Sequence, residues 1–197
     1  RRFADAAALG ANCLRLAHYP HHERVAEIAD EVGVMLWSEI PVYWAIDFAG
    51  PRTYRDAENQ LVELIRRDRN RASVIVWSVG NENADTRERL SFMRRLAAAA
   101  RRWDRTRLVS AACLVNKAKK RIEDRLARHL DVVGINEYYG WYDAEIDDLL
   151  EIGRNSRVGK PVIVTEVGAE APAGRRGKPN ALFTEDKMVA VYRAQVD

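Results

Sequence analysis

The sequence predicts an α/β fold of the (β/α)8 TIM-barrel type, with about six βα units in place of eight. Two observations support this prediction. Short β-branched or aliphatic runs alternate with longer segments of helical period, and polar residues follow the short runs directly. Such alternation is typical of parallel strands covered by helices. Barrel active sites are built at the carboxyl ends of the strands, where these polar residues would lie.

Six aliphatic runs are candidate strands. They are residues 12–16, 34–38, 73–78, 107–111, 132–136 and 161–165. Because the runs are almost continuously apolar, we expect strands that are buried on both faces. The polar residues that end them or follow them are Arg15, His18, Glu39, Asn81, Glu82, Asn136, Glu137 and Glu166.

The segments between these runs are candidate helices. Apolar residues at positions 90, 93, 96, 97 and 100 have the spacing of one buried helical face. Thr53 with Asp56, and Asp85 with Glu88, have capping-box spacing and predict two helix starts. Gly33 precedes a strand, where the end of a helix is expected.

A doubly wound sheet is the alternative architecture. The stretch "GANCLRLAHYP" around the first strand does not fit a glycine-rich phosphate loop, which favours the barrel. A closed barrel needs eight strands and about 250 residues, whereas this chain has 197. We therefore expect residues 1–197 to be a single barrel domain that is truncated at both ends, with no second domain.

Composition argues against several classes of function. The chain has 32 Lys and Arg against 29 Asp and Glu, and its basic clusters are scattered, so no nucleic-acid partner is expected. No segment approaches the roughly 20 apolar residues of a membrane span, and no signal peptide is recognisable. We expect a soluble, cytoplasmic protein without a membrane partner. Cys13 and Cys113 lack metal or disulfide spacing and are predicted to be buried free thiols.

Glu82 and Glu166 are the candidate catalytic residues. Each follows a strand-like run, so the two carboxylates can face each other across a barrel mouth. Retaining glycoside hydrolysis uses such a pair, a proton donor and a nucleophile, about 5 to 5.5 Å apart. Alone, Glu82 is better explained as an acid at a helix N-terminus. Only its pairing with Glu166 favours catalysis.

Polar and aromatic residues near these carboxylates are candidate substrate contacts. Sugar rings pack on aromatic faces, and the stretch "GINEYYGWYD" is rich in aromatics, although plain core packing also explains such clusters. Trp37, Trp44 and Trp77 fit either explanation. The histidines of "HYPHH" have no recognised ligand spacing, so no metal is expected. The candidate binding residues are Arg15, His18, Asn81, Asn136, Tyr138 and Tyr142.

Five blocks of the sequence, in order, resemble the barrel domain of glycoside hydrolase family 2, which contains β-galactosidases and β-glucuronidases. They are "LGANCLRLAHYP", "SEIP", "RDRNRASVIVWSVGNE", "INEYYGWY" and "PVIVTEVGAE", and they cover nearly the whole chain. The last two are nearer the β-glucuronidase branch. The resemblance implies that the six strands match barrel strands two to seven.

The resemblance also implies roles for single residues. Glu82 would be the general acid/base and Glu166 the nucleophile, with Asn81 contacting the sugar 2-hydroxyl. Tyr138 would support the nucleophile, and Tyr142 is a second tyrosine of the same loop. The pocket floor would be lined by Arg15 and His18.

We therefore expect a retaining β-glycosidase for β-glucuronides or β-galactosides that needs no cofactor. A catalytically inactive barrel fragment or a carbohydrate-binding module is the alternative. A homo-oligomer is compatible with both.

Overall fold

A computed structural model describes residues 2–141, 146–178 and 180–196. Its centre is a six-stranded parallel sheet with the order β1-β2-β3-β4-β7-β8. The strands are β1 (Cys13–Leu16), β2 (Met35–Glu39), β3 (Val74–Asn81), β4 (Leu108–Cys113), β7 (Val133–Asn136) and β8 (Val162–Glu166). Each lies within a few residues of its predicted position.

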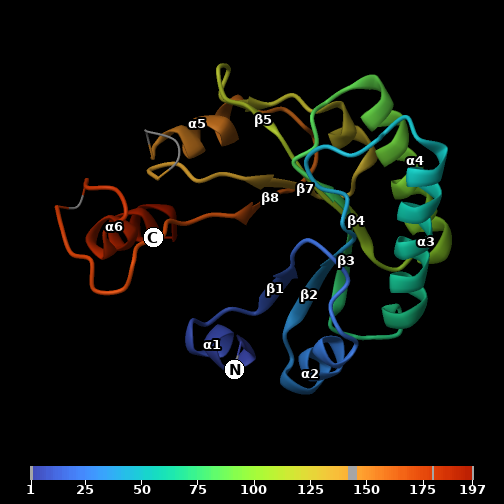
Figure 1. Cartoon of the computed structure of the whole chain (residues 1–197), viewed down its shortest axis with the longest axis horizontal. Helices are drawn as coiled ribbons and strands as arrows, with labels where there is room; N and C mark the ends of the chain where they lie inside the picture. The colour runs from blue at the N-terminus through green and yellow to red at the C-terminus, as the bar shows by residue number, and fades with distance from the viewer. Residues whose placement is uncertain (1, 142–145, 179, 197) are drawn as a thin grey trace.

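The strand order decides between the two predicted architectures. Each strand of the sheet is added beside the preceding one in the same direction, whereas the order reverses in a doubly wound sheet. The sheet is also curled (Figure 1). The curl brings the first and last strands together at their carboxyl ends, since Arg15 of β1 donates to Glu166 of β8. The prediction of an incomplete barrel of six strands is confirmed.

The helices are α1 (Arg2–Ala8), α2 (Arg24–Val32), α3 (Pro51–Asp68), α4 (Arg87–Trp103), α5 (Asp148–Asn155) and α6 (Glu185–Val196), with a 3-10 helix η1 at Arg125–His129. Helix α1 precedes the first strand, and α2, α3 and α4 cover the outer side of the curl (Figure 1). Helices α3 and α4 lie side by side against β3 and β4 (Figure 1). A short antiparallel hairpin, β5 (Val115–Asn116) and β6 (Arg121–Ile122), was not predicted.

Both predicted capping boxes differ from the observed helix starts. Helix α3 begins at Pro51 with Gly50 as its N-cap, so Thr53 lies inside the first turn. The fixed φ of proline suits the first helical position, which explains the earlier start. Helix α4 is capped by Thr86, one residue later than predicted, and the Thr86 hydroxyl accepts a hydrogen bond from the backbone N–H of Arg89.

The core lies between the sheet and helices α3 and α4. The predicted apolar face of α4 is buried at Met93, Leu96, Ala97 and Ala100. Trp77 of β3 is fully buried, and its indole N–H donates to Asp104 at 3.0 Å. Trp77 is therefore a core residue and not a sugar platform.

The two edges of the sheet are less covered than its centre. Cys113 in β4 is buried as predicted, but Cys13 is exposed because β1 is an edge strand. On the opposite edge, apolar residues of β8 are exposed at Val162, Ile163 and Val164. In the part of the chain that is described, no helix has the length and apolar character of a membrane span.

Candidate active site

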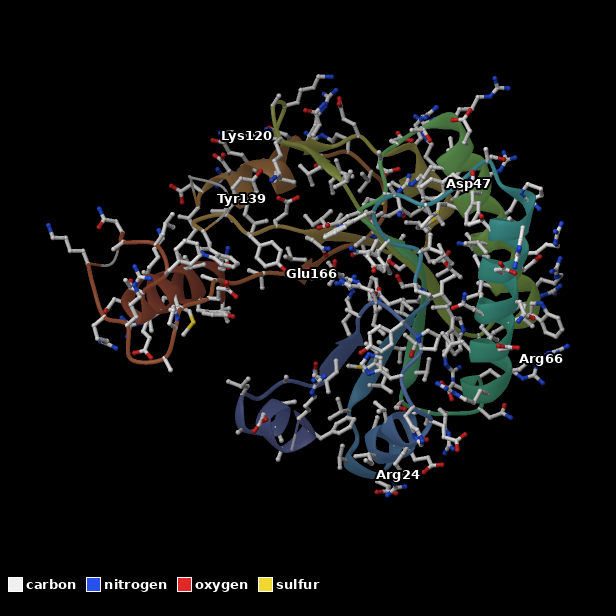
Figure 2. The ribbon with its side chains drawn as sticks, viewed as in Figure 1. Arg24, Asp47, Arg66, Lys120, Tyr139 and Glu166 are labelled. Carbon is white, nitrogen blue, oxygen red and sulfur yellow. The ribbon has the colours of Figure 1, made fainter. Side chains whose placement is uncertain are left out.

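Polar side chains from five strands meet at the carboxyl end of the sheet. They are Arg15 of β1, Glu39 of β2, Asn81 of β3, Asn136 of β7 and Glu166 of β8. In Figure 2, Glu166 lies near the middle of the molecule, whereas Arg24 and Arg66 lie on its outer side. Because every strand is parallel, residues that are far apart in sequence converge at this end.

Arg15 is the central residue of this cluster, because it donates hydrogen bonds to three other members. Its Nε and Nη2 donate to the two carboxylate oxygens of Glu39, at 3.1 and 3.0 Å. Nη2 also donates to Asn81 Oδ1 at 2.7 Å, and Nη1 donates to Glu166 Oε1 at 2.5 Å. Glu39 is only 1% exposed, so its buried carboxylate needs a partner, and the bidentate Arg15 guanidinium supplies one. Arg15 therefore fixes three acceptors from three different strands.

His18 extends the cluster toward solvent. Its Nδ1 lies 2.8 Å from Glu39 Oε1, its Nε2 lies 3.6 Å from Glu166 Oε1, and its ring stacks on Tyr43. The hydrogen bond with Glu39 raises the pKa of His18, and the charge of Glu166 adds to this effect. Partial burial and the nearby Arg15 oppose the rise. The imidazole therefore keeps its proton at higher pH than a free histidine does.

The raised pKa of His18 predicts a pH-dependent contribution to stability. A group whose pKa is higher in the folded state stabilises the fold fully below its unfolded pKa, near 6.5. The contribution is lost as pH rises through the folded-state pKa. We expect the difference in free energy of unfolding between the protein and a His18→Phe variant to be larger at pH 5.5 than at pH 8.5. Urea unfolding at both pH values measures this difference, and the reverse order would contradict the assigned direction.

Glu82 is the first residue after β3, and both of its carboxylate oxygens accept hydrogen bonds from neutral donors. Asn136 Nδ2 donates to Oε1 at 3.0 Å, and the indole N–H of Trp44 donates to Oε2 at 3.0 Å. Asn136 Nδ2 also donates to Asn81 Oδ1 at 2.9 Å. Since Arg15 donates to the same Asn81 oxygen, a continuous chain of hydrogen bonds joins Glu82 to the Arg15 cluster.

Glu166 is held by different donors. Its Oε1 accepts from Arg15, and its Oε2 accepts from the hydroxyl of Tyr138 at 2.6 Å. Glu82 and Glu166 line one cavity of about 570 Å³. Other residues that line it are Trp44, Leu114, Val115, Lys117, Asn136, Glu137, Tyr138, Trp141 and Glu170. The two predicted catalytic carboxylates therefore face the same space.

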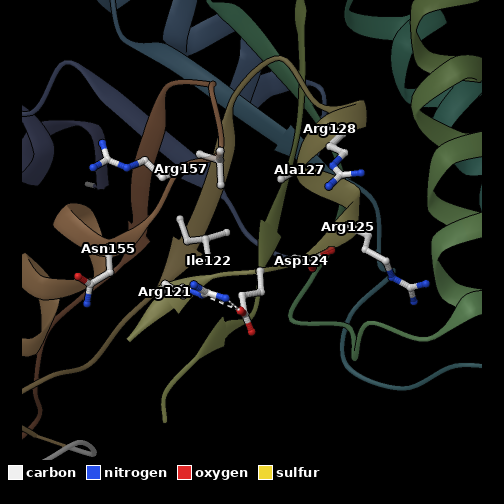
Figure 3. A pocket seen from close by; sticks show the side chains of 10 residues that line it. Arg121, Ile122, Asp124, Arg125, Ala127, Arg128, Asn155 and Arg157 are labelled. Atoms are coloured by element: carbon white, nitrogen blue, oxygen red, sulfur yellow. Dashed lines mark hydrogen bonds and ion pairs between the residues drawn. The ribbon is translucent and has the colours of Figure 1, made fainter. Parts of the chain in front are cut away.

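Another cavity, of about 350 Å³, lies between β6, η1 and the segment after α5 (Figure 3). Several charged residues line it, and some of them are bound to other side chains. Arg121 donates to Glu123, and Arg125 donates to Asp85. The 570 Å³ cavity is the better candidate, because Glu82, which follows β3, and Glu166, which ends β8, both line it.

Most of the predicted site residues are brought together. Arg15, His18, Asn81, Asn136 and Tyr138 all take part in the network around Glu82 and Glu166. Tyr142 lies outside the described residues. No group of His, Cys, Asp and Glu side chains that could hold a metal ion occurs in the described ranges.

Sequence reasoning did not assign a site role to Glu39 or Tyr43, and it left Trp44 open between core packing and a sugar platform. Glu39 had a detectable signal, because it ends a strand-like run in the same way as the other site residues. Trp37, whose role was open, is buried and donates its indole N–H to Glu39 at 3.2 Å. Trp44 and Tyr43 lie in an irregular segment after β2, which has no periodic pattern of apolar residues.

Comparison with known proteins identifies the family of this chain. The family model described as "Glycosyl hydrolases family 2, TIM barrel domain" matches residues 4–192. A β-glucuronidase of Paenibacillus borealis is 34% identical over 200 residues, which cover 90% of this chain and 33% of that protein. Human β-glucuronidase is 31% identical over 192 residues, covering 90% of this chain and 28% of the human protein.

Solved structures show the same similarity. A β-D-glucuronidase of Dictyoglomus thermophilum has a TM-score of 0.85 and 29% identity, covering 97% of this chain and 36% of that one. A family 2 β-galacturonidase of Eisenbergiella tayi bound to galacturonate has a TM-score of 0.88 and 27% identity, covering 98% of this chain and 35% of that one. The chain spans about a third of the length of these relatives. It belongs to the TIM barrel domain family of the family 2 glycosyl hydrolases.

Proposed function

We propose that this chain is the catalytic barrel region of a retaining β-glycosidase. Glu166 would be the nucleophile and Glu82 the general acid/base. The main supporting observation is the single cavity that both carboxylates line, each of them held by its own set of donors.

The contacts of Glu166 suit a nucleophile. A carboxylate must be ionised to attack the anomeric carbon. One oxygen of Glu166 accepts a charge-assisted hydrogen bond from Arg15, and the other accepts from Tyr138. Together the two donors fix the direction of the carboxylate. Glu166 is therefore the better nucleophile of the pair.

The contacts of Glu82 suit an acid that later becomes a base. Its donors are the neutral amide of Asn136 and the neutral indole of Trp44. Glu82 takes part in no salt bridge among the described residues, whereas Glu166 pairs with Arg15. A group in such a setting can give a proton in one step and take it back in the next.

The reaction then proceeds in two displacements. Glu82 protonates the leaving oxygen while Glu166 attacks the anomeric carbon, which gives a covalent glycosyl-enzyme. Glu82 next removes a proton from water, and the water attacks the same carbon and frees Glu166. Asn81 Oδ1 is occupied by Arg15 and Asn136, so the Asn81 amide N–H is the group that remains for the sugar 2-hydroxyl. No cofactor is required by these steps.

A β-glucuronide is the first substrate to test, because the curated relatives are β-glucuronidases. Glu137 lines the same cavity and carries an acid that could repel the carboxylate of a uronic acid. A β-galactoside is therefore the second substrate to test. No role for nucleic acid or a membrane is proposed, and a homo-oligomer stays a prediction.

The test is the anomeric form of the sugar that the intact protein releases. NMR spectra are recorded during hydrolysis of p-nitrophenyl β-glucuronide and p-nitrophenyl β-galactoside. We expect the β-anomer to be the first product from at least one of them. An α-anomer as first product would contradict the double displacement. Saturable binding without turnover would favour the carbohydrate-binding alternative.

A further inference from the structure

Asn83 has no part in the chemistry described above, yet it is fully buried beside the acid/base. Its side-chain Nδ2 donates to the backbone carbonyls of Trp44 at 3.1 Å and Val42 at 3.4 Å. A Cβ at Gly80 would lie 2.7 Å from Asn83 Oδ1, so a glycine leaves the room that this amide needs. Asn83 therefore ties the turn after β3 to the segment after β2.

This segment after β2 presents the Trp44 indole to the acid/base. The indole N–H of Trp44 donates to Glu82 Oε2, and its backbone N–H donates to the carbonyl of Asn81 at 2.9 Å. The backbone N–H of Asn81 in turn donates to the carbonyl of Val42 at 2.9 Å. Residues 42–44 are thus held against residues 81–83 by the main chain and by the Asn83 amide together.

Two residues in this contact have a positive φ, a backbone conformation that residues other than glycine rarely adopt. The φ of Trp44 is 53° and that of Glu82 is 51°. Such conformations persist only where surrounding contacts hold them. Trp44 is 64% exposed, so packing alone does little to fix its ring. Loss of the Asn83 amide would remove one donor to the Trp44 carbonyl and let the segment relax.

We propose that Asn83 is a positioning residue for proton transfer by Glu82. It fixes the Trp44 segment, and the Trp44 indole fixes the direction of the Glu82 carboxylate. The inference rests on the proposed function of Glu82. Attack by Glu166 does not depend on Asn83, because Arg15 and Tyr138 hold Glu166.

The choice of leaving group separates proton transfer by Glu82 from attack by Glu166. A 2,4-dinitrophenyl group leaves without a proton, whereas a phenyl group needs one. The values of kcat/KM for these two β-glucuronides report on the first displacement, before the water step in which Glu82 acts as a base. Asn83→Ala should lower kcat/KM for the phenyl substrate about 10- to 100-fold and change that for the dinitrophenyl substrate less than about threefold.

A second variant and a control complete the design. Trp44→Phe keeps an aromatic ring at an exposed position but removes the N–H, and it should reproduce the same pattern. It also tests the inference if Asn83→Ala fails to fold. Met93→Ala is the control, because Met93 is buried against the same turn and makes none of these hydrogen bonds. It should change the two kcat/KM values by the same factor.

The outcomes are distinguishable. Equal losses on both substrates in Asn83→Ala and Trp44→Phe, or no loss on the phenyl substrate, would overturn the positioning role while leaving the glycosidase intact. If the unchanged protein hydrolyses neither β-glucuronides nor β-galactosides, the proposed function itself is wrong. The inference then fails with it. If only β-galactosides are hydrolysed, the same pair of leaving groups is used on that sugar.

Discussion

Replacing Glu166 with alanine is expected to lower kcat/KM for p-nitrophenyl β-glucuronide by about 10⁴-fold or more. The covalent intermediate cannot form without this carboxylate, and no other described side chain bonds to both Arg15 and Tyr138. The shortened side chain leaves space beside the anomeric carbon. Sodium azide should therefore restore part of the turnover by direct attack, and the product should be an α-glycosyl azide, because only one displacement occurs.

The matched control for this variant is Glu63→Ala. Glu63 is an exposed glutamate on α3, on the outer side of the curl. Its removal should leave kcat/KM within about twofold, since surface substitutions away from a site have small effects. Full activity of Glu166→Ala would contradict the nucleophile assignment. A lost activity that azide does not restore, or a glycosyl azide of β configuration, would point to a different role for Glu166.

The positions of the two carboxylates could be predicted from the sequence because each follows a nearly continuous aliphatic run. A buried parallel strand has such a pattern, and its carboxyl end is where barrel sites form. The positions of Glu82 and Glu166 could therefore be predicted without any knowledge of side-chain contacts. The same holds for Asn136, which ends β7.

The features that sequence reasoning missed depend on contacts between strands. No role was assigned to Asn83 from the sequence, and only the segment after β2 shows what its amide binds. Glu39 belongs to the site because it accepts hydrogen bonds from Arg15, which lies 24 positions earlier in the chain. Cys13 was predicted to be buried, but β1 is an edge strand, and an aliphatic run does not reveal whether a neighbour covers it.

Arg15→Met is expected to destabilise the fold by about 3 to 5 kcal/mol. The reason is Glu39, which is 1% exposed and would keep a buried charge without its guanidinium partner. The control is Arg102→Met, because Arg102 pairs with Glu58 on the surface and is 67% exposed. That change should cost less than about 1 kcal/mol. Urea unfolding at pH 7 compares the two, and equal costs would contradict a buried role for the Arg15 charge.

The Arg15→Lys variant separates the effect of the positive charge at this position from the effect of the guanidinium geometry. Its ammonium is a point charge, whereas the planar guanidinium reaches Glu39, Asn81 and Glu166 at once. We expect Arg15→Lys to keep part of the stability but to lower kcat/KM about 10²-fold, because Glu166 loses its fixed direction. Full activity in this variant would show that charge alone suffices.

The double variant Arg15→Met with Glu39→Leu tests whether the same residue acts separately on stability and on activity. Replacing both members of a buried ion pair by apolar residues leaves no unpaired charge and often restores the lost stability. Activity should stay low in the double variant, since Glu166 and Asn81 still lack the donor that Arg15 supplied. Recovery of both would mean that Arg15 serves the fold alone. Recovery of stability without activity would show that Arg15 orients Glu166 as well as neutralising Glu39.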